Sequence, residues 1–277
     1  MKMLEGKVAA VTGAASGLGR AMALAFAGEG MHAALADVDE PGLKSTLNEV
    51  QSRGVRAFAM RVDVSRYQEV ESFCSKAIAQ FGATHVVCNN AGVSPLGAVW
   101  ENTLADWQWI LGVNLWGVIH GVRAFVPRLL AQGEGHVVNT ASVAGLISPP
   151  GMGAYNVTKH AVVALSESLY HDLRLRGSPV GVSVLCPAYV PTGIADSERN
   201  RPRELLNPAK SSSKEETMLK KAVASGKLSA DDVARAVVAA VKEERFYVLT
   251  HPRIKGAIRA RMEDILDERA PRNPLAL

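Results

Sequence analysis

The chain has 277 residues, of which 48% are hydrophobic, enough for one large α/β domain with a full core. The net charge is only +4, and the basic and acidic residues from Lys242 onward are interspersed, so we expect no nucleic-acid surface. The three cysteines are isolated, which argues against a disulfide set or a metal site. No signal sequence and no run of about 18 apolar residues is evident, which argues against a membrane span. We therefore expect a cytoplasmic protein.

Apolar, β-branched runs alternate with longer helical patterns along the chain. In order, the runs that predict strands are residues 7–13, 32–37, 56–63, 85–92, 136–142, 180–187 and 246–250. The helical patterns cover residues 18–29, 41–53, 67–81, 103–130, 153–169, 230–244 and 253–268. Such alternation predicts right-handed βαβ units. The expected fold class is α/β, a single-domain doubly wound parallel sheet with helices on both faces, in three αβα layers.

One segment interrupts this alternation. Residues 193–227 are charged and include SSSKEE at 211–216, which is too polar for a core and too long for an ordinary connection. We interpret the segment as a mobile substrate lid, with a partly disordered surface insertion as the alternative. Ser229 is the expected N-cap of the next helix. No interdomain linker is evident, so residues 1–277 are expected to form one domain with a helical extension at about 252–277.

The turn TGAASGLG, residues 12–19, follows the first predicted strand and opens the first helix. This is the context that a dinucleotide site requires. Gly13 allows the tight turn, while Gly17 and Gly19 let the backbone and the helix approach a pyrophosphate. The unpaired N–H groups at the start of the helix favour an anion. A glycine-rich turn alone is weak evidence, but in this position it predicts nucleotide binding.

Further signals stand at the ends of the following strands, where open α/β sheets bind ligands. Asp37 ends the second strand, where a carboxylate binds the adenosine ribose hydroxyls and repels a 2′-phosphate. Neither Ser16 nor Val38 supplies a compensating cation, so NAD is favoured over NADP. Asp63 is placed to bind the adenine amino group, and NNAG at 89–92 is expected to pass close to the adenosine ribose. The alternative for Asp37 is an ordinary turn residue.

Tyr155 and Lys159 lie four residues apart near the start of the helix predicted over 153–169, so they share one face. Taken alone, the pair is best explained as a packed aromatic ring beside a snorkelling lysine. The nucleotide motifs upstream favour a chemical role instead. The pair therefore has to be interpreted together with the rest of the chain.

The chain as a whole resembles the short-chain dehydrogenase/reductase family over residues 4–249. The motifs that carry the resemblance are TGAASGLG, Asp63–Val64, NNAG, Asn114, Ser142 and Tyr155-x-x-x-Lys159. Each motif is weak by itself, and the set is highly specific. Members are single-domain Rossmann-like oxidoreductases, typically dimers or tetramers, that exchange a hydride between a nicotinamide and an alcohol or ketone.

The resemblance implies a role for each matching position. Tyr155 is the expected acid/base, and Lys159 is expected to hold the nicotinamide ribose and to lower the tyrosine pKa. Ser142 would bind the substrate oxygen, and Asn114 would hold a water in a proton relay to Lys159. The residues expected to contact NAD are Gly13, Ser16, Gly17, Leu18, Gly19, Asp37, Val38, Asp63, Val64, Asn90, Ala91, Gly92, Tyr155, Lys159, Pro187, Val190 and Thr192. Ala188 departs from the glycine usual in the family and would slightly narrow the nicotinamide pocket.

Alcohol oxidation needs a base for the hydroxyl proton, and free tyrosine, with a pKa of about 10, is a poor base at neutral pH. A cation about 4 Å away contributes roughly 4 kcal/mol at an effective dielectric constant of about 20. That would bring the pKa of Tyr155 down by up to about 3, with desolvation opposing part of the change. We therefore interpret the Tyr155–Lys159 face as a proton switch poised near the working pH.

Two loops are expected to border the substrate, one after NNAG and one after Ser142. Neither loop contains an arginine or a lysine. The side chains expected in the substrate wall, beside Ser142 and Tyr155, are Leu96, Leu146, Ile147, Met152 and Tyr189. An apolar wall favours a neutral, hydrophobic secondary alcohol or ketone over a small carboxylic acid. The alternative is that these residues belong to the core or to a subunit interface.

Family members often associate through the two helices that carry Asn114 and Tyr155. Aromatic residues on the first of these helices, including Trp107, Trp109 and Trp116, suit such a bundle. We therefore expect a homo-oligomer, a tetramer or else a dimer. The expected partner is a small hydrophobic alcohol or ketone, with no nucleic acid and no membrane.

Two other functions are weighed against this one. An NADPH-dependent reductase of 3-oxoacyl thioesters on acyl carrier protein shares the fold and the catalytic residues. Asp37 and the lack of a basic patch beside the cleft count against it. A non-catalytic nucleotide sensor is the second alternative, and it would not need the four catalytic candidates together.

Overall fold

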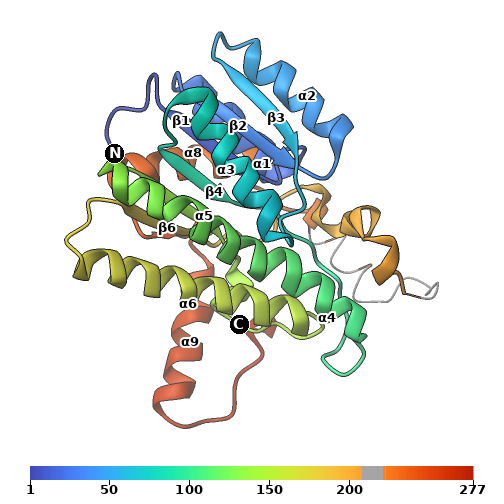
Figure 1. The fold of residues 1–277 in the computed structure, drawn as a ribbon. Helices are drawn as coiled ribbons and strands as arrows, with labels where there is room; N and C mark the ends of the chain where they lie inside the picture. Colours follow the sequence, from blue (N-terminus) through green and yellow to red (C-terminus); the bar gives the residue numbers. More distant parts are fainter. Residues whose placement is uncertain (208–216, 218–220, 222, 277) are drawn as a thin grey trace.

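A parallel sheet of seven strands forms the centre of the computed structural model, which describes residues 1–207, 217, 221 and 223–276 (Figure 1). The strands lie in the order β3-β2-β1-β4-β5-β6-β7, and every neighbouring pair is parallel. Their bounds are Val8–Thr12 (β1), His32–Asp37 (β2), Ala57–Arg61 (β3), Val86–Asn89 (β4), His136–Thr140 (β5), Gly181–Leu185 (β6) and Tyr247–Val248 (β7). This arrangement confirms the predicted α/β class and places β1 and β4 at the topological switch point.

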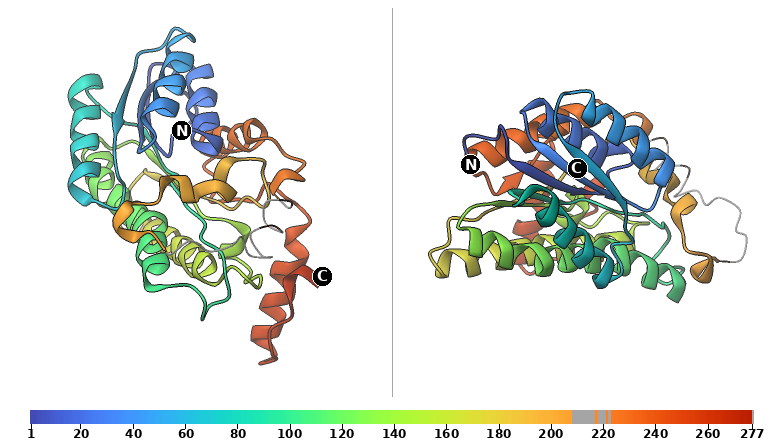
Figure 2. Two further views of the ribbon diagram at one scale, coloured as in Figure 1. Left: turned by 90° about the vertical axis from the view of Figure 1, so that its right-hand side faces the viewer. Right: turned by 45° about the horizontal axis from the view of Figure 1, so that its top comes forward.

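Helices cover both faces of the sheet and complete the predicted three layers (Figures 1 and 2). α1, α2 and α8 pack on one face, and α3, α5 and α6 pack on the other. The bounds of the α-helices are Gly17–Gly28 (α1), Glu40–Gln51 (α2), Tyr67–Phe81 (α3), Leu104–Ile110 (α4), Gly117–Gln132 (α5), Gly153–Leu175 (α6), Ala230–Glu243 (α8) and Ile254–Leu266 (α9). Shorter helical turns cover Leu111–Trp116 (η1), Val143–Gly145 (η2), Gly193–Asn200 (η3), Arg203–Leu205 (η4) and Pro274–Ala276 (η5).

The central strands are buried along their whole length. All residues of β1, β4, β5 and β6 are buried, as parallel strands with helices on both sides require. Polar side chains appear where these strands end, at Thr12, Asn89 and Thr140. The carboxyl edge of the sheet is therefore where the apolar core gives way to hydrogen-bonding groups.

The long helix predicted over 103–130 consists of α4, the π-helix η1 and α5. Its start is a capping box, in which the side chains of Thr103 and Asp106 each accept from the other's backbone N–H.

The run Leu104–Gln132 is long and apolar enough to cross a membrane by length and composition, contrary to the expectation from the sequence. Half of its most apolar stretch is buried inside the fold, where α5 packs against α3, so the run acts as a core helix.

The described part of the predicted lid forms the two short helices η3 and η4. The remainder of that prediction, at 208–216, 218–220 and 222, lies outside the described residues. Beyond it, Ser229 caps α8 as predicted, because its hydroxyl accepts from the N–H of Asp232 at 3.1 Å.

The C-terminal extension forms a helical arm that points away from the sheet (Figures 1 and 2). The arm is α9, followed by a tail that returns along it. Nε of Arg272 donates to the carboxylate of Asp264 at 3.0 Å, and its Nη2 donates to the carbonyl of Ala260 at 2.7 Å. The tail is therefore fixed to α9 by polar contacts.

Candidate active site

The glycine turn joins β1 to α1 at the edge of a cavity of about 1060 Å³. Gly13 and Gly17 have φ angles of +67° and +54°, a left-handed backbone that favours glycine. A Cβ on Gly13 would lie 2.8 Å from the Cα of Ala91, so the turn and the NNAG segment touch only because that atom is missing. Four of the predicted cofactor contacts in the turn line the cavity: Gly13, Ser16, Gly17 and Leu18.

Gly19, also predicted as a cofactor contact, does not line the cavity. A Cβ there would lie 2.0 Å from the carbonyl oxygen of Gly13, so Gly19 allows α1 to pack against the turn. Ser16 is the N-cap of α1, and the first turn of the helix carries no acidic side chain. The positive end of the helix dipole is thus left free for an anion at the cavity edge.

Asp37 stands at the end of β2 with its carboxylate fixed by the backbone. Oδ2 accepts from the N–H of Ala15 at 2.9 Å, and Oδ1 accepts from the N–H of Asp39 at 3.0 Å. These bonds tie the glycine turn to β2 and hold a negative charge at the cavity edge. The other predicted residues that line this end are Val38, Asp63 and Val64.

The NNAG segment leaves β4 and is held by the ends of β1 and β5. The hydroxyl of Thr12 accepts from the N–H of Asn90 at 2.9 Å, and Nδ2 of Asn90 donates to the Thr12 carbonyl at 3.0 Å. The Thr140 hydroxyl donates to Oδ1 of Asn90 at 3.3 Å. Asn90, Ala91 and Gly92 therefore line the middle of the cavity.

Ser142, Tyr155 and Lys159 converge in the same cavity beyond the NNAG segment. The ammonium of Lys159 donates to the carbonyl of Thr140 at 2.9 Å and lies 5.5 Å from the centre of the Tyr155 ring. The Ser142 hydroxyl donates to the carbonyl of Pro187 at 3.3 Å and also contacts the Tyr155 hydroxyl. A phenol, an alcohol and a cation thus meet where β5 ends and α6 begins.

Asn114 is fully buried in the π-helix η1. Its Oδ1 accepts from the N–H of Val93 at 2.8 Å, and its Nδ2 donates to the carbonyl of Val93 at 2.9 Å. Nδ2 also donates to the hydroxyl of Thr158 at 3.3 Å, in the turn of α6 before Lys159. Asn114 does not line the cavity, and its side chain fixes the loop after NNAG against α6. π-helical turns are frequent at functional sites.

Burial dominates the protonation of the tyrosine and the lysine. It raises the pKa of Tyr155 to about 12, against an opposing effect of the Ser142 hydroxyl. It lowers the pKa of Lys159 to about 8. The pKa of Tyr155 therefore moves opposite to the expected direction, because desolvation outweighs the hydrogen bond with the Ser142 hydroxyl. The Lys159 ammonium lies 5.5 Å from the ring centre.

The segment after β6 closes another side of the cavity with Pro187, Val190 and Thr192. The Cβ of Thr192 lies 3.2 Å from where a Cβ on Gly17 would stand, so this segment touches the glycine turn. The N–H of Ala188 donates to Nδ1 of His251 at 3.2 Å. Burial lowers the pKa of His251, which favours the neutral ring that can accept this bond. Nothing in the sequence pattern around His251 indicates this role.

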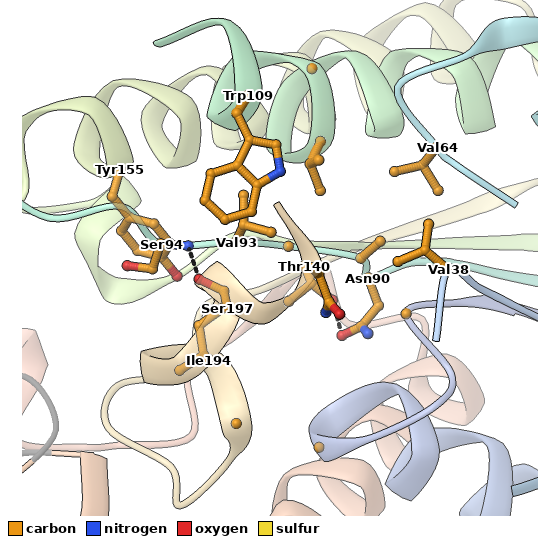
Figure 3. A pocket seen from close by; sticks show the side chains of 18 of the residues that line it. Val38, Val64, Asn90, Val93, Ser94, Trp109, Thr140, Tyr155, Ile194 and Ser197 are labelled. Carbon is orange, nitrogen blue, oxygen red and sulfur yellow. Dashed lines mark hydrogen bonds between the residues drawn. The ribbon is translucent and has the colours of Figure 1, made fainter. Parts of the chain in front are cut away.

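The wall beyond Tyr155 differs in part from the predicted one. Met152 and Tyr189 line the cavity, whereas the predicted Leu96, Leu146 and Ile147 do not. Ile147 is buried in the core. Leu146 follows the tight turn η2 and packs against a buried cluster of α6 and β6 side chains. Lining residues absent from the prediction include Val93, Ser94, Trp109, Ile194, Ser197 and Leu205. In Figure 3, Trp109 and Ile194 approach the cavity from opposite sides, with Tyr155 beside them.

A buried ion pair fastens the described part of the lid across this wall. The guanidinium of Arg201 bonds to the carboxylate of Asp106, and the two side chains are 0% and 4% exposed. Nδ2 of Asn207 also donates to Asp106, at 2.7 Å. The Arg201 guanidinium lies 4.5 Å from the centre of the Trp109 ring. Trp109 was expected at a subunit interface, and this stack places it in the cavity wall instead.

Among the described residues, no group of three or more histidine, cysteine and acidic residues is placed to hold a metal ion. Cys74, Cys88 and Cys186 are free and buried, which agrees with their predicted place in the core.

Comparison with known proteins gives consistent similarities. The family model described as short chain dehydrogenase matches residues 7–203. A crystal structure of a short chain dehydrogenase/reductase from Burkholderia phymatum, in complex with NAD, is 51% identical, with 100% of each chain covered and a TM-score of 0.97. A CLA biosynthesis dehydrogenase/reductase of Lactiplantibacillus plantarum is 32% identical over 98% of this chain and 97% of its own. A 1-deoxy-11-beta-hydroxypentalenate dehydrogenase of Streptomyces exfoliatus is 36% identical over 95% and 89%, respectively.

Proposed function

The chain belongs to the short-chain dehydrogenase family, and from this premise we propose that it transfers a hydride between NAD(H) and a neutral, hydrophobic secondary alcohol or ketone. One observation carries the proposal: a single cavity joins the glycine turn and Asp37 to Ser142, Tyr155 and Lys159. A dinucleotide laid along the carboxyl ends of the strands would bring its reactive ring to the tyrosine.

The residues along the cavity fit NAD. The free N-terminus of α1 suits a diphosphate, and the fixed carboxylate of Asp37 suits the hydroxyls of the adenosine ribose. Lys159 would hold the nicotinamide ribose, and Thr192 would contact the nicotinamide amide. Bound NAD supplies the hydride acceptor. The Burkholderia phymatum relative, in complex with NAD, supports this choice.

In this proposal Tyr155 exchanges the substrate proton at its hydroxyl, and Ser142 positions the substrate oxygen. Asn114 holds the loop after NNAG and, through a water, continues the proton path from Lys159. Because burial raises the pKa of Tyr155 to about 12, its hydroxyl is protonated at neutral pH. A protonated hydroxyl suits proton donation to a ketone. Alcohol oxidation needs the deprotonated hydroxyl as a base, so we expect oxidation to become faster as the pH rises.

The substrate end of the cavity favours a neutral molecule. Its wall includes the apolar side chains of Val93, Trp109 and Met152. The buried charges next to it, Asp106 and Arg201, pair with each other. A hydrophobic secondary alcohol or ketone, aromatic or alicyclic, would bury apolar surface here without leaving a charge unpaired.

The alternative is an NADPH-dependent reductase of 3-oxoacyl thioesters. One observation speaks for it, because Arg61 lines the cavity near Asp37, where a 2′-phosphate would lie. However, Arg61 lies 3.8 Å from a carboxylate oxygen of Glu40 and 4.0 Å from one of Glu69. Among the described residues, no cation lies at ion-pair distance from Asp37, so its charge remains to repel a 2′-phosphate, which favours NAD.

We also propose that the protein is cytoplasmic and acts as a homo-oligomer, a tetramer rather than a dimer, with no nucleic-acid or membrane partner. A half-exposed apolar side chain on the helix that carries Tyr155 supports the assembly, namely Val157 on α6, which does not line the cavity. Ile265 and Leu266 on the α9 arm add further exposed apolar surface.

Turnover of NAD⁺ with aryl and alicyclic secondary alcohols, compared with charged hydroxy acids, tests the proposal. We expect the neutral alcohols to be preferred.

Tyr155→Phe should reduce turnover by at least about 100-fold, because the proton exchange is lost, while NADH binding by nicotinamide fluorescence persists. Tyr170→Phe is the matched control, since Tyr170 packs in the core from the same helix and should retain activity. Near-normal turnover by Tyr155→Phe would refute the role of Tyr155 in proton exchange. A preference for charged hydroxy acids would refute the neutral, hydrophobic substrate class.

A further inference from the structure

Arg199 lies near the end of the lid helix η3, and its side chain folds back over the start of that helix. Its Nη1 donates to the carbonyls of Gly193 and Asp196, both at 2.8 Å. Its Nη2 lies 3.1 Å from where a Cβ on Gly193 would stand. The residue is exposed, and the function proposed above gives it no role.

Gly193 connects this guanidinium to the glycine turn. It follows Thr192, whose Cβ lies 3.2 Å from the Cβ position of Gly17. Arg199 lines the same cavity as Gly17, and it also lines a second hollow beside Val38. The guanidinium is therefore next to the part of the cavity that runs from the N-terminus of α1 to the adenosine ribose end.

Three other arginines that line the cavity face carboxylates, in the ion pairs Arg61–Glu40, Arg66–Asp63 and Arg201–Asp106. Among the described residues, Arg203 of η4 also lines the cavity without an ion pair, but it lies beyond Arg201 on the lid and not against the segment that touches the glycine turn. Within the described residues, the side chain of Arg199 donates to backbone carbonyls, and no carboxylate lies at ion-pair distance from it. Since carbonyl oxygens carry no net charge, the charge of Arg199 is left uncompensated.

We infer that Arg199 binds the diphosphate of the dinucleotide from the lid side, while the N-terminus of α1 binds it from the other. A guanidinium presents a planar set of N–H donors that matches phosphate oxygens, and charge-assisted bonds of this kind are strong. The inference rests on NAD(H) being the cofactor, as proposed above, and is independent of which alcohol reacts.

The contact would also connect the cofactor to the substrate wall. Ile194 and Ser197 lie on the same short helix as Arg199 and line the substrate end. Ser197 accepts from the N–H of Ser94 at 3.0 Å, which joins η3 to the loop after NNAG (Figure 3). A diphosphate held by Arg199 would therefore add a contact that stabilises η3, and with it this part of the substrate wall.

The test measures NADH binding by nicotinamide fluorescence, and ADP and adenosine binding by displacement of NADH. In Arg199→Gln, we expect NADH and ADP each to bind about 10-fold more weakly, and adenosine, which lacks phosphate, to bind as in the wild type. The loss should shrink as the salt concentration rises, because the lost contact is ionic and exposed. Arg199→Lys keeps the cation but not the planar donor set, so it should lose less.

Arg203→Gln is the matched control, because Arg203 lies in η4 of the same lid, is exposed and lines the same cavity. It should bind all three ligands as the wild type does. Unchanged NADH affinity in Arg199→Gln would overturn the inference. So would an equal loss for adenosine, which indicates a structural role, or an equal loss in Arg203→Gln, which indicates a general charge effect. A wild-type protein that bound no NADH would refute the proposed cofactor, and the inference with it.

Discussion

Lys159 combines a positive charge with almost complete burial. The residue is 3% exposed, and its ammonium donates to the carbonyl of Thr140 at 2.9 Å. Burial lowers its pKa from 10.5 to about 8. Because the folded protein disfavours the protonated form that the unfolded chain accepts, the lysine destabilises the fold at neutral pH by up to about 3 kcal/mol. The proposed chemistry needs this cation, so function and stability oppose each other at this position.

We therefore predict that Lys159→Met abolishes turnover and raises the melting temperature at pH 7.5, with the lost bond to Thr140 offsetting part of the gain. The unfolded chain holds the lysine proton up to about pH 10.5, whereas the folded protein holds it up to about pH 8. The destabilisation by the buried lysine is therefore full below pH 8 and fades as the pH rises towards 10.5. The difference in melting temperature between variant and wild type should shrink between pH 7.5 and 10. Exposed Lys44→Met is the control, and a pH-independent gain in Lys159→Met would contradict the prediction.

Asp37 carries a negative charge that two backbone N–H groups hold in place, and we propose that this charge selects the cofactor. We predict that Asp37→Ala weakens NADH binding by about 10-fold and narrows the preference over NADPH, because the ribose loses an acceptor and a 2′-phosphate loses a repulsive neighbour. Asp39→Ala is the control, since that carboxylate caps α2 through the N–H of Gly42 at 3.2 Å. A fluorescence titration in which the wild type prefers NADPH would instead support the thioester reductase.

Among the elements, the described part of the lid and α4 are joined by the buried pair Arg201–Asp106. We predict that Asp106→Asn lowers the free energy of unfolding by about 3 kcal/mol, because the buried Arg201 keeps only the exposed Glu198, 3.1 Å away, as a counter-charge. The Michaelis constant for the alcohol should also rise, since Arg201 stacks on Trp109 in the substrate wall. Denaturant unfolding and steady-state kinetics measure the two effects.

The control for this prediction is an ion pair of the same type on the surface. Glu243 and Arg245 are 60% and 45% exposed, so Glu243→Gln should cost less than about 1 kcal/mol. If Asp106→Asn were no less stable than Glu243→Gln, the lid would not depend on its buried pair.

The elements also show which features the sequence could predict. The strand–helix alternation, the glycine turn and the Tyr155–Lys159 spacing are local patterns, and the parallel sheet with helices on both faces followed from general rules of βαβ connection. The stack of Trp109 on Arg201 joins residues that are far apart in the sequence, and it depends on the path of the lid. Leu146 was expected in the substrate wall, but the tight turn η2 directs it into the core. No local pattern indicated either contact.

The π-helix at Asn114 belongs to the same group of unpredicted features. Helical periodicity over 103–130 predicts one continuous helix, because an extra residue in a single turn hardly changes the apolar spacing. The extra turn coincides with the two hydrogen bonds that the Asn114 side chain makes to Val93, on a separate loop. Only the folded arrangement brings that loop to the helix.

At the scale of the whole molecule, exposed apolar surface remains away from the cavity. Val157 on α6 is 50% exposed, and Leu266 on the α9 arm is 81% exposed. A helix of about 13 residues is marginal in water without packing on an apolar face, and the arm points away from the sheet (Figures 1 and 2). Both features are consistent with burial against further copies of the chain, where each Å² of apolar surface contributes about 25 cal/mol.

We predict a tetramer by multi-angle light scattering at micromolar concentration. Val157→Glu should shift the protein to a smaller species, because a carboxylate buried between copies would lack a partner, whereas NADH binding should persist, since Val157 does not line the cavity. Leu175→Glu places the same charge at the exposed end of the same helix, and it should leave the mass unchanged because water still reaches that end. A monomeric wild type would contradict the assembly and leave the α6 face and the α9 arm exposed to solvent in the active protein.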